Sequence, residues 1–400
     1  MFIPTNRVVL FFSDLRPEGG LFTCMQLNKT TDWDTMISRF FKAIYKKYNQ
    51  TFPAGCAAAM MLMLPGAASG SDIVVTKAYR WTGDSIIQGP FKAYAPTPFR
   101  IVSDYSAQPG YYMGVEKEWN LKNDISEYPQ LTTSNTLHNA IFNMGLDEMV
   151  NAIEPDRTLR TGKEWPGVWT RDVSYSIILA MAALQPEVSR ISLEHKITPN
   201  GRIVQDTGSG GAWPISSDRQ IWGIAAFEVY KATGDKSWLN RIYPVIKNSL
   251  EDDYKTIYDP ETGLVRGETS FIDWREQSYP RWMQTADIAQ SEALGTSVVH
   301  AQAWRTLAQI ARIMGENTEA QKYDARADAL AEAINSQLWS DEKGYYNMYL
   351  YGRDNMIANP RAETLGEALA ILYDVASPNR ARILTEKNCL LYTSPSPRDA

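Results

Sequence analysis

Reactive sulfur and imidazole groups are scarce in this sequence of 400 residues, which has three cysteines and three histidines. All the cysteines, Cys24, Cys56 and Cys389, lie outside the segment 131–388, which we interpret below as the helical domain. That domain is therefore expected to have no disulfide and no thiol site. The histidines are far apart and lack the spacing of zinc ligands, so the sequence predicts neither a metal centre nor a cofactor.

Clustered positive charge and long apolar runs are also lacking. The formal net charge is −6, and no basic cluster occurs beyond residue 50, which argues against a nucleic-acid partner. The apolar run 52–64 is interrupted by Pro53 and Gly55 and is too short for a membrane span. Aromatic residues are abundant, with 12 Trp and 21 Tyr. This number suits a carbohydrate cleft, although a large helical core would also use many aromatics.

The apolar run is the centre of a pattern typical of export. It follows a basic segment that begins at Met36 and precedes small residues that end at Gly70. Basic, apolar and small segments in this order make up a secretory signal peptide. We therefore interpret 36–70 as a signal peptide and 1–35 as upstream sequence outside the native protein. The mature protein is expected in the periplasm or outside the cell, without a stable membrane span. The alternative is a buried hydrophobic hairpin.

Strand-like and helical patterns follow one another along the rest of the chain. Segment 72–130 is expected to be a small β-rich region, because short runs of β-forming residues alternate there with glycine and proline. These runs are 73–76, 85–88 and 99–102. From 131 to 388, apolar residues recur at helical spacing. One helix is expected near Ile221, where Ser217 and Gln220 have the spacing of a capping box.

The helical segment contains an internal repeat. Gly234 and Gly315 are 81 residues apart, and so are Gly263 and Gly344. Each unit consists of a helix, a glycine-containing turn, a second helix and a turn into a long loop. A repeated helical hairpin buries its apolar face only by stacking on its neighbours. The long aromatic loops between units favour a closed ring with a functional end over an open solenoid.

One loop between helical regions collects the residue types that sugar chemistry needs. This acidic loop, 267–282, contains three carboxylates, two arginines and two tryptophans: Glu268, Asp273, Glu276, Arg275, Arg281, Trp274 and Trp282. Tryptophan offers a flat apolar face to a pyranose ring, and arginine donates hydrogen bonds to hydroxyl groups. Carboxylates can transfer the proton in glycosidic cleavage. The alternative is a surface loop of paired charges whose tryptophans fill the core.

An ordered set of motifs resembles the six-hairpin glycosidases. This clan includes glucoamylases, trehalases, processing α-glucosidases, bacterial α-L-rhamnosidases and disaccharide phosphorylases. The motifs are W-T-R-D at 169–172, S-S-D-R-Q-I-W at 216–222, T-G-D at 233–235 and then the acidic loop. The resemblance covers about residues 130–388. It implies a mainly α fold, an incomplete (α/α)6 toroid of helical hairpins that follows the small β-rich N-terminal region. It also implies an oligosaccharide or polysaccharide substrate.

The resemblance implies sugar-binding residues at two helix starts. In the clan, the arginine and aspartate of W-T-R-D bind hydroxyls of the terminal sugar, which carries over to Arg171 and Asp172. We extend the expectation to Asp218 and Arg219 of the second motif, because side chains at a helix start have a rigid mount. The alternative for Asp172 is a carboxylate that stabilises the first helical turn. Candidate sugar platforms, each of which could equally be a core residue, are Trp169 and Trp213.

The clan's general acid lies in the loop after the second hairpin, which is the acidic loop here. Asp273-Trp274 resembles the pairing found there in trehalases and phosphorylases, whereas Glu268 better matches the glucoamylase position. We favour Asp273, then Glu276 and then Glu268. Trp274 would exclude water from the acid and raise its pKa, as a proton donor near neutral pH requires. Arg275 and Trp274 are expected to contact the substrate.

The last residues, 389–400, have neither helix nor strand pattern, and only about four of six hairpins precede them. We expect this tail to be non-native and the native chain to continue past about Lys387. The clan's catalytic base lies on a late hairpin, so we expect it to be missing here and this chain to hydrolyse nothing. The leading interpretation is an exported glycoside hydrolase, inverting and specific for α-linked sugars. Alternatives are a disaccharide phosphorylase of the clan, a non-catalytic sugar-binding toroid, and a polysaccharide lyase, which would need a Tyr/His pair.

Overall fold

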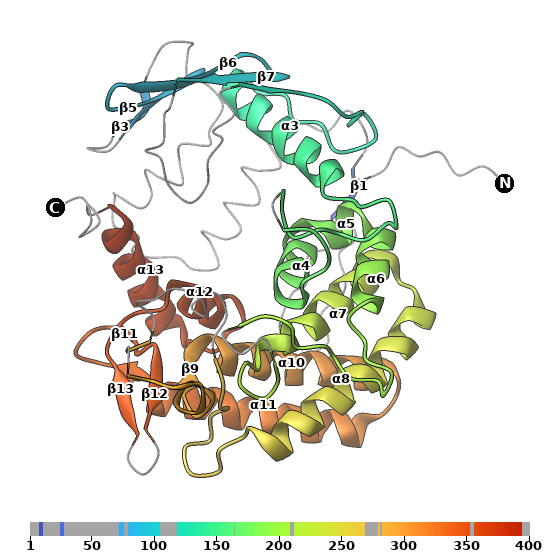
Figure 1. The fold of residues 1–400 in the computed structure, drawn as a ribbon, viewed down its shortest axis with the longest axis vertical. Coiled ribbons are helices and arrows are strands. Elements are labelled where there is room, and N and C mark those ends of the chain that lie inside the picture. Colours follow the sequence, from blue (N-terminus) through green and yellow to red (C-terminus); the bar gives the residue numbers. More distant parts are fainter. Residues whose placement is uncertain are drawn as a thin grey trace. The chain divides into compact units, whose positions relative to one another are not determined.

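The structure is a computed structural model that describes residues 8–10, 25–27, 72–75, 79–104, 118–163, 165–208, 212–268, 279–280, 282–352 and 356–393. The chain forms two compact units. The first comprises residues 1–121 and 130–144, and the second comprises residues 122–129 and 145–400. Strands and helices of both units appear in Figure 1. The signal peptide expected at 36–70 lies outside the described residues and stays a prediction.

The first unit contains two antiparallel sheets. Strands β1 (Val8–Leu10) and β2 (Met25–Leu27) pair with each other. A six-stranded sheet follows, in which every strand pairs with the next one along the chain. Its strands are β3 (Asp72–Val75), β4 (Arg80–Thr82), β5 (Ser85–Gln88), β6 (Phe91–Thr97), β7 (Arg100–Ser103) and β8 (Glu118–Asn120). The strand runs expected around residues 73–76, 85–88 and 99–102 are confirmed as β3, β5 and β7.

Helix α3 (Thr136–Asn151) begins in this unit. The side-chain oxygen of Asn135 accepts a hydrogen bond from the backbone N–H of His138 at 3.0 Å, which caps the first turn. Leu137 and Ala140 of α3 form a small apolar core with Ala95 of β6. The edge of the His138 ring meets the Trp81 ring at a centroid distance of 4.8 Å. The sheet is therefore stabilised by one amphipathic helical segment.

The second unit is built mainly from helices. Its early helices are α4 (Thr170–Ser176), η1 (Ile177–Met181), α5 (Ala182–Leu184), α6 (Pro186–Glu194), η2 (Asp218–Gln220), α7 (Ile221–Thr233) and α8 (Lys236–Thr256). Its later helices are α9 (Thr285–Ala289), α10 (Leu294–Ile313), α11 (Asn317–Gln337), α12 (Thr364–Leu372) and α13 (Pro378–Thr393). The mainly α fold of helical hairpins, with a small β-rich N-terminal region, is therefore confirmed.

Glycines at repeated positions turn one helix into the next. Gly234 ends α7 in the left-handed conformation at φ 68°, and Gly315 follows α10 at φ 83°. Gly263 and Gly344, which follow the second helix of each pair, have φ values of 76° and 69°. Residues with a Cβ rarely adopt this conformation, so glycine is the natural choice at such turns. The repeat found in the sequence thus corresponds to two hairpins with matching turns.

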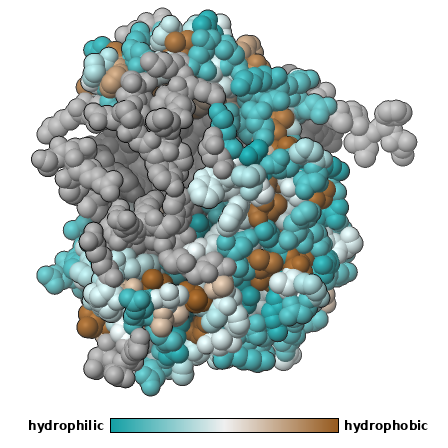
Figure 2. All heavy atoms as spheres, in the orientation of Figure 1, coloured by the Kyte–Doolittle hydropathy of each residue, from teal (hydrophilic) through white to brown (hydrophobic). Residues whose placement is uncertain are grey.

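Helix α10 is the central element of the helical unit. It packs against α7, α8, α11 and α12 (Figure 1). Val298, Leu307 and Ile310 on α10 have no exposed surface. Full burial of such a side chain contributes about 1.5–3 kcal/mol, so this helix supplies much of the apolar core. Outside the core, Figure 2 shows a mostly hydrophilic described surface with scattered hydrophobic residues.

Short strands fix the loops that surround the start of α10. β9 (Glu292–Ala293) pairs with β12 (Tyr349–Tyr351), which pairs with β13 (Ile357–Asn359). A separate pair consists of β10 (Trp339–Ser340) and β11 (Tyr345–Tyr346). The backbone N–H of Gly267 donates to the carbonyl of Ser291 at 2.8 Å. The first residues of the acidic loop are therefore tied to the strand that precedes α10.

The capping box expected at Ser217 and Gln220 is wrong. The Ser217 hydroxyl donates to the backbone carbonyl of Arg266 at 2.7 Å, and the Gln220 side chain bonds to Asp253. Both side chains satisfy buried polar groups of neighbouring segments, a requirement that outweighs local capping. The helix instead starts with the 3-10 turn η2. Among the described residues, no helix is long and apolar enough to cross a membrane.

Candidate active site

The W-T-R-D motif forms the start of α4. The backbone N–H of Thr170 donates to Asp206 Oδ1 at 3.0 Å, and Asp206 Oδ2 lies 2.8 Å from Lys196 Nζ. Asp206 therefore satisfies an N–H of the first helical turn, as a capping carboxylate does. Arg171 and Asp172 follow directly on this anchored turn.

The second motif opens η2 and α7, and Gln205 holds its first residues. The Gln205 side-chain amide donates to Asp218 Oδ1 at 2.8 Å, and its oxygen accepts from the backbone N–H of Arg219 at 3.0 Å. Gln205 and Asp206 are neighbours in the chain. A single loop between α6 and η2 thus anchors both helix starts that carry the expected sugar-binding residues.

Arg171 brings the two helix starts together. Its Nε lies 3.5 Å from Asp172 Oδ2, and its Nη1 lies 3.9 Å from Asp218 Oδ2. Arg171 and Asp218 are almost completely buried, whereas the Asp172 side chain keeps 24% of its surface exposed. We call Arg171, Asp172 and Asp218 the charged cluster. Its one accessible member, Asp172, is the group that a ligand can reach.

Asp172 has an unusual electrostatic environment. Burial raises its pKa, the guanidinium of Arg171 opposes that change, and the nearby carboxylates of Asp218 and Asp206 add to it. The net result is a pKa above the ordinary aspartate value. Perturbed carboxyl groups of this kind occur more often at functional sites than elsewhere, although structural ion pairs also produce them.

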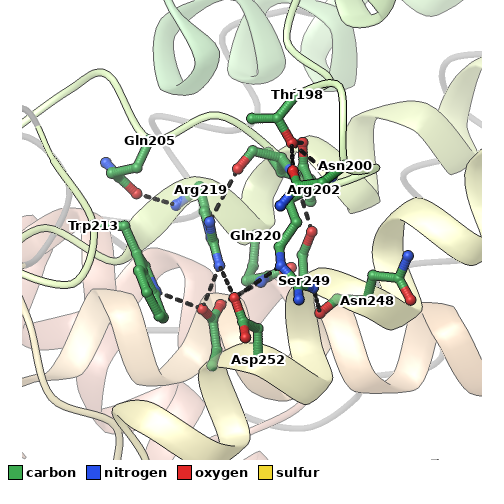
Figure 3. A network of polar contacts seen from close by, with 12 residues as sticks. Thr198, Asn200, Arg202, Gln205, Trp213, Arg219, Gln220, Asn248, Ser249 and Asp252 are labelled. Atoms are coloured by element: carbon green, nitrogen blue, oxygen red, sulfur yellow. Dashed lines mark hydrogen bonds and ion pairs between the residues drawn. The ribbon is translucent and has the colours of Figure 1, made fainter.

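Arg219 occupies a different environment from the charged cluster. Its Nη1 donates to the carbonyl of Ile203 at 3.0 Å, and its Nη2 donates to Asp253 Oδ1 at 2.7 Å (Figure 3). The guanidinium lies 4.9 Å from the centre of the Trp213 ring. Arg219 is 4% exposed, so its side chain faces other protein groups. Its expected contact with a substrate stays a prediction.

Of the three carboxylates that the sequence offers as the general acid, Glu268 is the one that lies within the described residues. It is 1% exposed, and its Oε2 accepts a hydrogen bond from the Ser216 hydroxyl at 2.8 Å. Its backbone pairs with Ser216 as a parallel bridge, and its carbonyl accepts from Thr296 Oγ1 at 2.6 Å. Gly208 approaches so closely that a Cβ there would overlap Ser216 and Glu268. Glu268 is therefore an enclosed carboxylate beside the loop that anchors the charged cluster.

The described part of the structure does not place several expected site residues at the charged cluster or at Glu268. Trp169 is 38% exposed, and its indole N–H donates to the carbonyl of Pro166 at 3.3 Å. The residues favoured for catalysis and substrate contact in the acidic loop lie outside the described residues and stay predictions: Asp273, Trp274, Arg275 and Glu276. Within the described residues, no group of histidine, cysteine, aspartate or glutamate could hold a metal ion.

Sequence reasoning missed the residues that position the site. Gln205, Asp206, Asp253 and His300 belong to no motif. Asp253 is placed 34 residues from Arg219 and 40 from Trp213 along the chain, and such contacts have no local signal. His300 is one of the buried residues of α10. It is 1% exposed, and its Nε2 lies 3.2 Å from Asp253 Oδ2.

The comparisons with known proteins agree with the motifs. Residues 195–382 match a family model described as the bacterial α-L-rhamnosidase six-hairpin glycosidase domain. No curated protein matches the chain.

Several solved structures are similar to the chain. The GH78 family rhamnosidase of Bacillus sp. GL1 is 22% identical, with a TM-score of 0.42 over 57% of this chain and 23% of that chain. The neutral trehalase of Saccharomyces cerevisiae is 12% identical, with a TM-score of 0.45 over 58% and 55%. The GH63 mannosylglycerate hydrolase of Thermus thermophilus is 14% identical, with a TM-score of 0.45 over 61% and 76%.

The chain thus spans about a quarter of the length of the Bacillus rhamnosidase. The resemblance that the motifs imply is confirmed by the family model, which matches residues 195–382 of this chain to the six-hairpin glycosidases.

Proposed function

We propose that the chain is part of an exported glycoside hydrolase that cleaves α-linked sugars with inversion, and that the charged cluster binds the terminal sugar. The observation that carries this proposal is the contact between Arg171 and both Asp172 and Asp218. The cluster joins W-T-R-D to the matched family segment, because Asp218 lies within residues 195–382 and Arg171 precedes them. Two motifs that resemble the same clan are therefore neighbours in space.

The chemistry of the cluster suits a sugar. Carboxylate oxygens accept hydrogen bonds from hydroxyl groups, and a guanidinium donates them in one plane. Arg171 and Asp218 are held by protein groups, while Asp172 is partly exposed. A sugar hydroxyl that bonds to Asp172 would replace water on a preorganised carboxylate. Preorganisation of this kind reduces the entropic cost of binding.

The proposed reaction needs two further groups. An inverting glycosidase has a general acid on one side of the glycosidic bond and a base that activates water on the other, roughly 6.5–9.5 Å apart. We propose Asp273 as the acid, with Glu276 and Glu268 as alternatives in that order. The family model that matches the chain is named for α-L-rhamnosidases, so an α-L-rhamnoside is the first substrate to test.

Binding is tested by titrating the protein with methyl α-L-rhamnoside and with methyl α-D-glucoside. Asp172→Asn and Arg171→Lys are each expected to weaken binding about tenfold or more, because a hydrogen bond to a charged group contributes about 1.5–3 kcal/mol. Arg190→Lys is the matched control, since Arg190 forms an exposed ion pair with Glu187. Binding that is unchanged in Asp172→Asn and Arg171→Lys would remove the charged cluster from the sugar site.

Stereochemistry has its own test. Proton NMR of the first product of α-L-rhamnoside hydrolysis by the full-length enzyme distinguishes the two anomers before they equilibrate. Inversion predicts that the β-anomer forms first. An initial α-anomer would show a retaining mechanism, and loss of turnover in Glu268→Gln but not in Asp273→Asn would move the acid to Glu268.

A further inference from the structure

A buried carboxylate, Asp253 on α8, is the centre of a polar network. Figure 3 labels its members Trp213, Arg219 and Gln220. Asp253 is 1% exposed. Its Oδ1 accepts from the Trp213 indole N–H at 2.7 Å and from Arg219 Nη2 at 2.7 Å. Its Oδ2 contacts the Gln220 side chain and lies 3.2 Å from His300 Nε2. The loop before η2, η2 itself and α10 therefore all meet at one carboxylate.

This network compensates the charge of Asp253. Burial disfavours the ionised form, but the hydrogen bond from His300 and the positive charge of Arg219 outweigh it, and the pKa of Asp253 is lowered. Asp253 is therefore an anion with fixed partners. A buried ion of this kind is costly to disturb, because removal of one partner leaves the others unsatisfied.

Trp213 is the one member of the network that is not enclosed. Its side chain is half-buried, whereas Arg219, Gln220, Asp253 and His300 are buried. The guanidinium of Arg219 lies over the ring, 4.9 Å from its centre, while the indole N–H is held by Asp253. One face and one edge of the ring are thus fixed by charged groups. Such contacts restrict the rotation of an otherwise accessible aromatic side chain.

Trp213 also lies next to the groups that anchor the charged cluster. Arg219, on which its ring rests, directly follows Asp218, and Gln205 binds Asp218 as well as the Arg219 backbone. Asp218 in turn lies 3.9 Å from Arg171. The same short 3-10 turn therefore supports a flat aromatic surface and a hydrogen-bonding cluster. A pyranose needs both, because it has hydroxyl groups around its edge and C–H bonds on its face.

We propose that Asp253 is a positioning residue that holds Trp213 as a platform for the C–H face of a pyranose ring. Arg219 acts in the same way, as the support behind the ring. The inference rests on the proposed sugar-binding function, which it deepens by assigning the platform and its support. The positioning step itself is measurable without any sugar.

The first measurement is hydrogen exchange of the Trp213 indole N–H, followed by NMR on protein labelled with ¹⁵N-tryptophan. The signal is assigned by its loss in Trp213→Phe. In the wild-type protein we expect slow exchange, and in Asp253→Asn we expect exchange that is about tenfold faster or more, as for a lost hydrogen bond to a charged group. Asp252→Asn is the matched control, because Asp252 directly precedes Asp253 on α8 and pairs with Arg202 at 3.0 Å and with Arg219 at 3.9 Å, whereas the Trp213 indole N–H donates to Asp253.

These exchange data decide the positioning step even if Asp253→Asn does not fold. Exchange of the wild-type indole N–H as fast as that of free indole would overturn the proposal. Exchange that is equally slow in wild type and in folded Asp253→Asn would do the same. Slow exchange in wild type and in Asp252→Asn, with fast exchange in Asp253→Asn, supports it.

The second measurement is a double-mutant cycle on the affinity for methyl α-L-rhamnoside. Trp213→Ala and Asp253→Asn are each expected to weaken binding about fivefold to tenfold, and the double variant no further, because Asp253 acts through Trp213. Additive losses would overturn the positioning role. If the wild type binds sugar and Trp213→Ala binds equally well, the platform is wrong while the proposed function stands. If the wild type and all variants bind no sugar, the proposed function itself fails.

Discussion

Buried carboxylates in the helical unit differ in how their negative charge is compensated. Asp253 is surrounded by donors, and its pKa is lowered. Glu292 on β9 has no exposed surface, and burial together with its interaction with Asp259 raises its pKa to about 8. The first residue is therefore an anion at neutral pH, whereas the second is largely protonated. The protonation of Glu292 in the folded protein can be tested with one substitution, Glu292→Gln.

Glu292→Gln is expected to remove a pH dependence of stability. A group with a raised native pKa contributes its full stability below the unfolded-state value of 4.5 and loses it as pH rises through about 8. Each pKa unit corresponds to about 1.4 kcal/mol, so the wild type should lose a few kcal/mol of unfolding free energy over this window. Denaturant unfolding at pH 5 and pH 8 measures it.

Glu187→Gln is the control for this experiment, because Glu187 forms an exposed pair with Arg190. The wild type and Glu187→Gln should share the same decline in stability between pH 5 and pH 8, and Glu292→Gln should show a smaller one. An equal decline in Glu292→Gln and the wild type would mean that Glu292 is ionised in the folded protein.

At the scale of elements, the turns of the helical hairpins follow from glycines that the sequence identifies. Gly234 and Gly315 share the left-handed conformation, and so do Gly263 and Gly344. Gly267, at φ 114°, has a second constraint, because a Cβ there would overlap the Ser217 side chain. Around Gly315 a Cβ would meet nothing within 4 Å. The two positions therefore separate backbone strain from steric overlap.

Gly267→Ala is expected to destabilise the protein more than Gly315→Ala. Backbone strain at a positive φ costs of order 1–3 kcal/mol in both variants. Only Gly267→Ala adds overlap in a packed region, typically about another 1–3 kcal/mol. Thermal unfolding of the two variants in parallel tests the difference. Equal losses would show that the Ser217 side chain moves aside at little cost.

The sequence predicted elements better than the contacts between them. Strands β3, β5 and β7 and the repeated hairpins have local patterns, and W-T-R-D and S-S-D-R-Q identify Arg171, Asp172 and Asp218. Gln205, Asp206 and Asp253 could not be found in this way. Their partners Asp218, Thr170 and Trp213 are 13, 36 and 40 residues away in the chain, and only the folded chain brings them together. The capping box at Ser217 failed for the same reason, since distant buried groups bind both side chains.

At the scale of the whole molecule, the candidate site combines residues that precede the family match with residues that lie within it. Arg171 and Asp172 precede the matched residues 195–382, whereas Asp218 and Asp253 lie within them. The contact between Arg171 and Asp218 joins the two parts. A variant protein that starts at residue 195 would lack two of the three residues of the charged cluster, so the site needs the helices before the matched segment.

Export is a prediction that concerns the whole chain. The basic, apolar and small segments between Met36 and Gly70 predict that mature protein begins near residues 68–71. Expression in a Gram-negative host should place this form in the periplasm. Mass spectrometry of the purified protein identifies its first residue. A protein that stays in the cytoplasm and keeps Met1 would contradict the export proposal.

The central claim is that the charged cluster binds a sugar, and the most direct test is a crystal structure of the protein with L-rhamnose or methyl α-L-rhamnoside bound. We expect a pyranose ring whose hydroxyl groups lie within hydrogen-bonding distance, about 2.6–3.2 Å, of Asp172 and Arg171. A face of the ring should lie against Trp213. Sugar density elsewhere on the molecule, with only water at Asp172, would contradict the account.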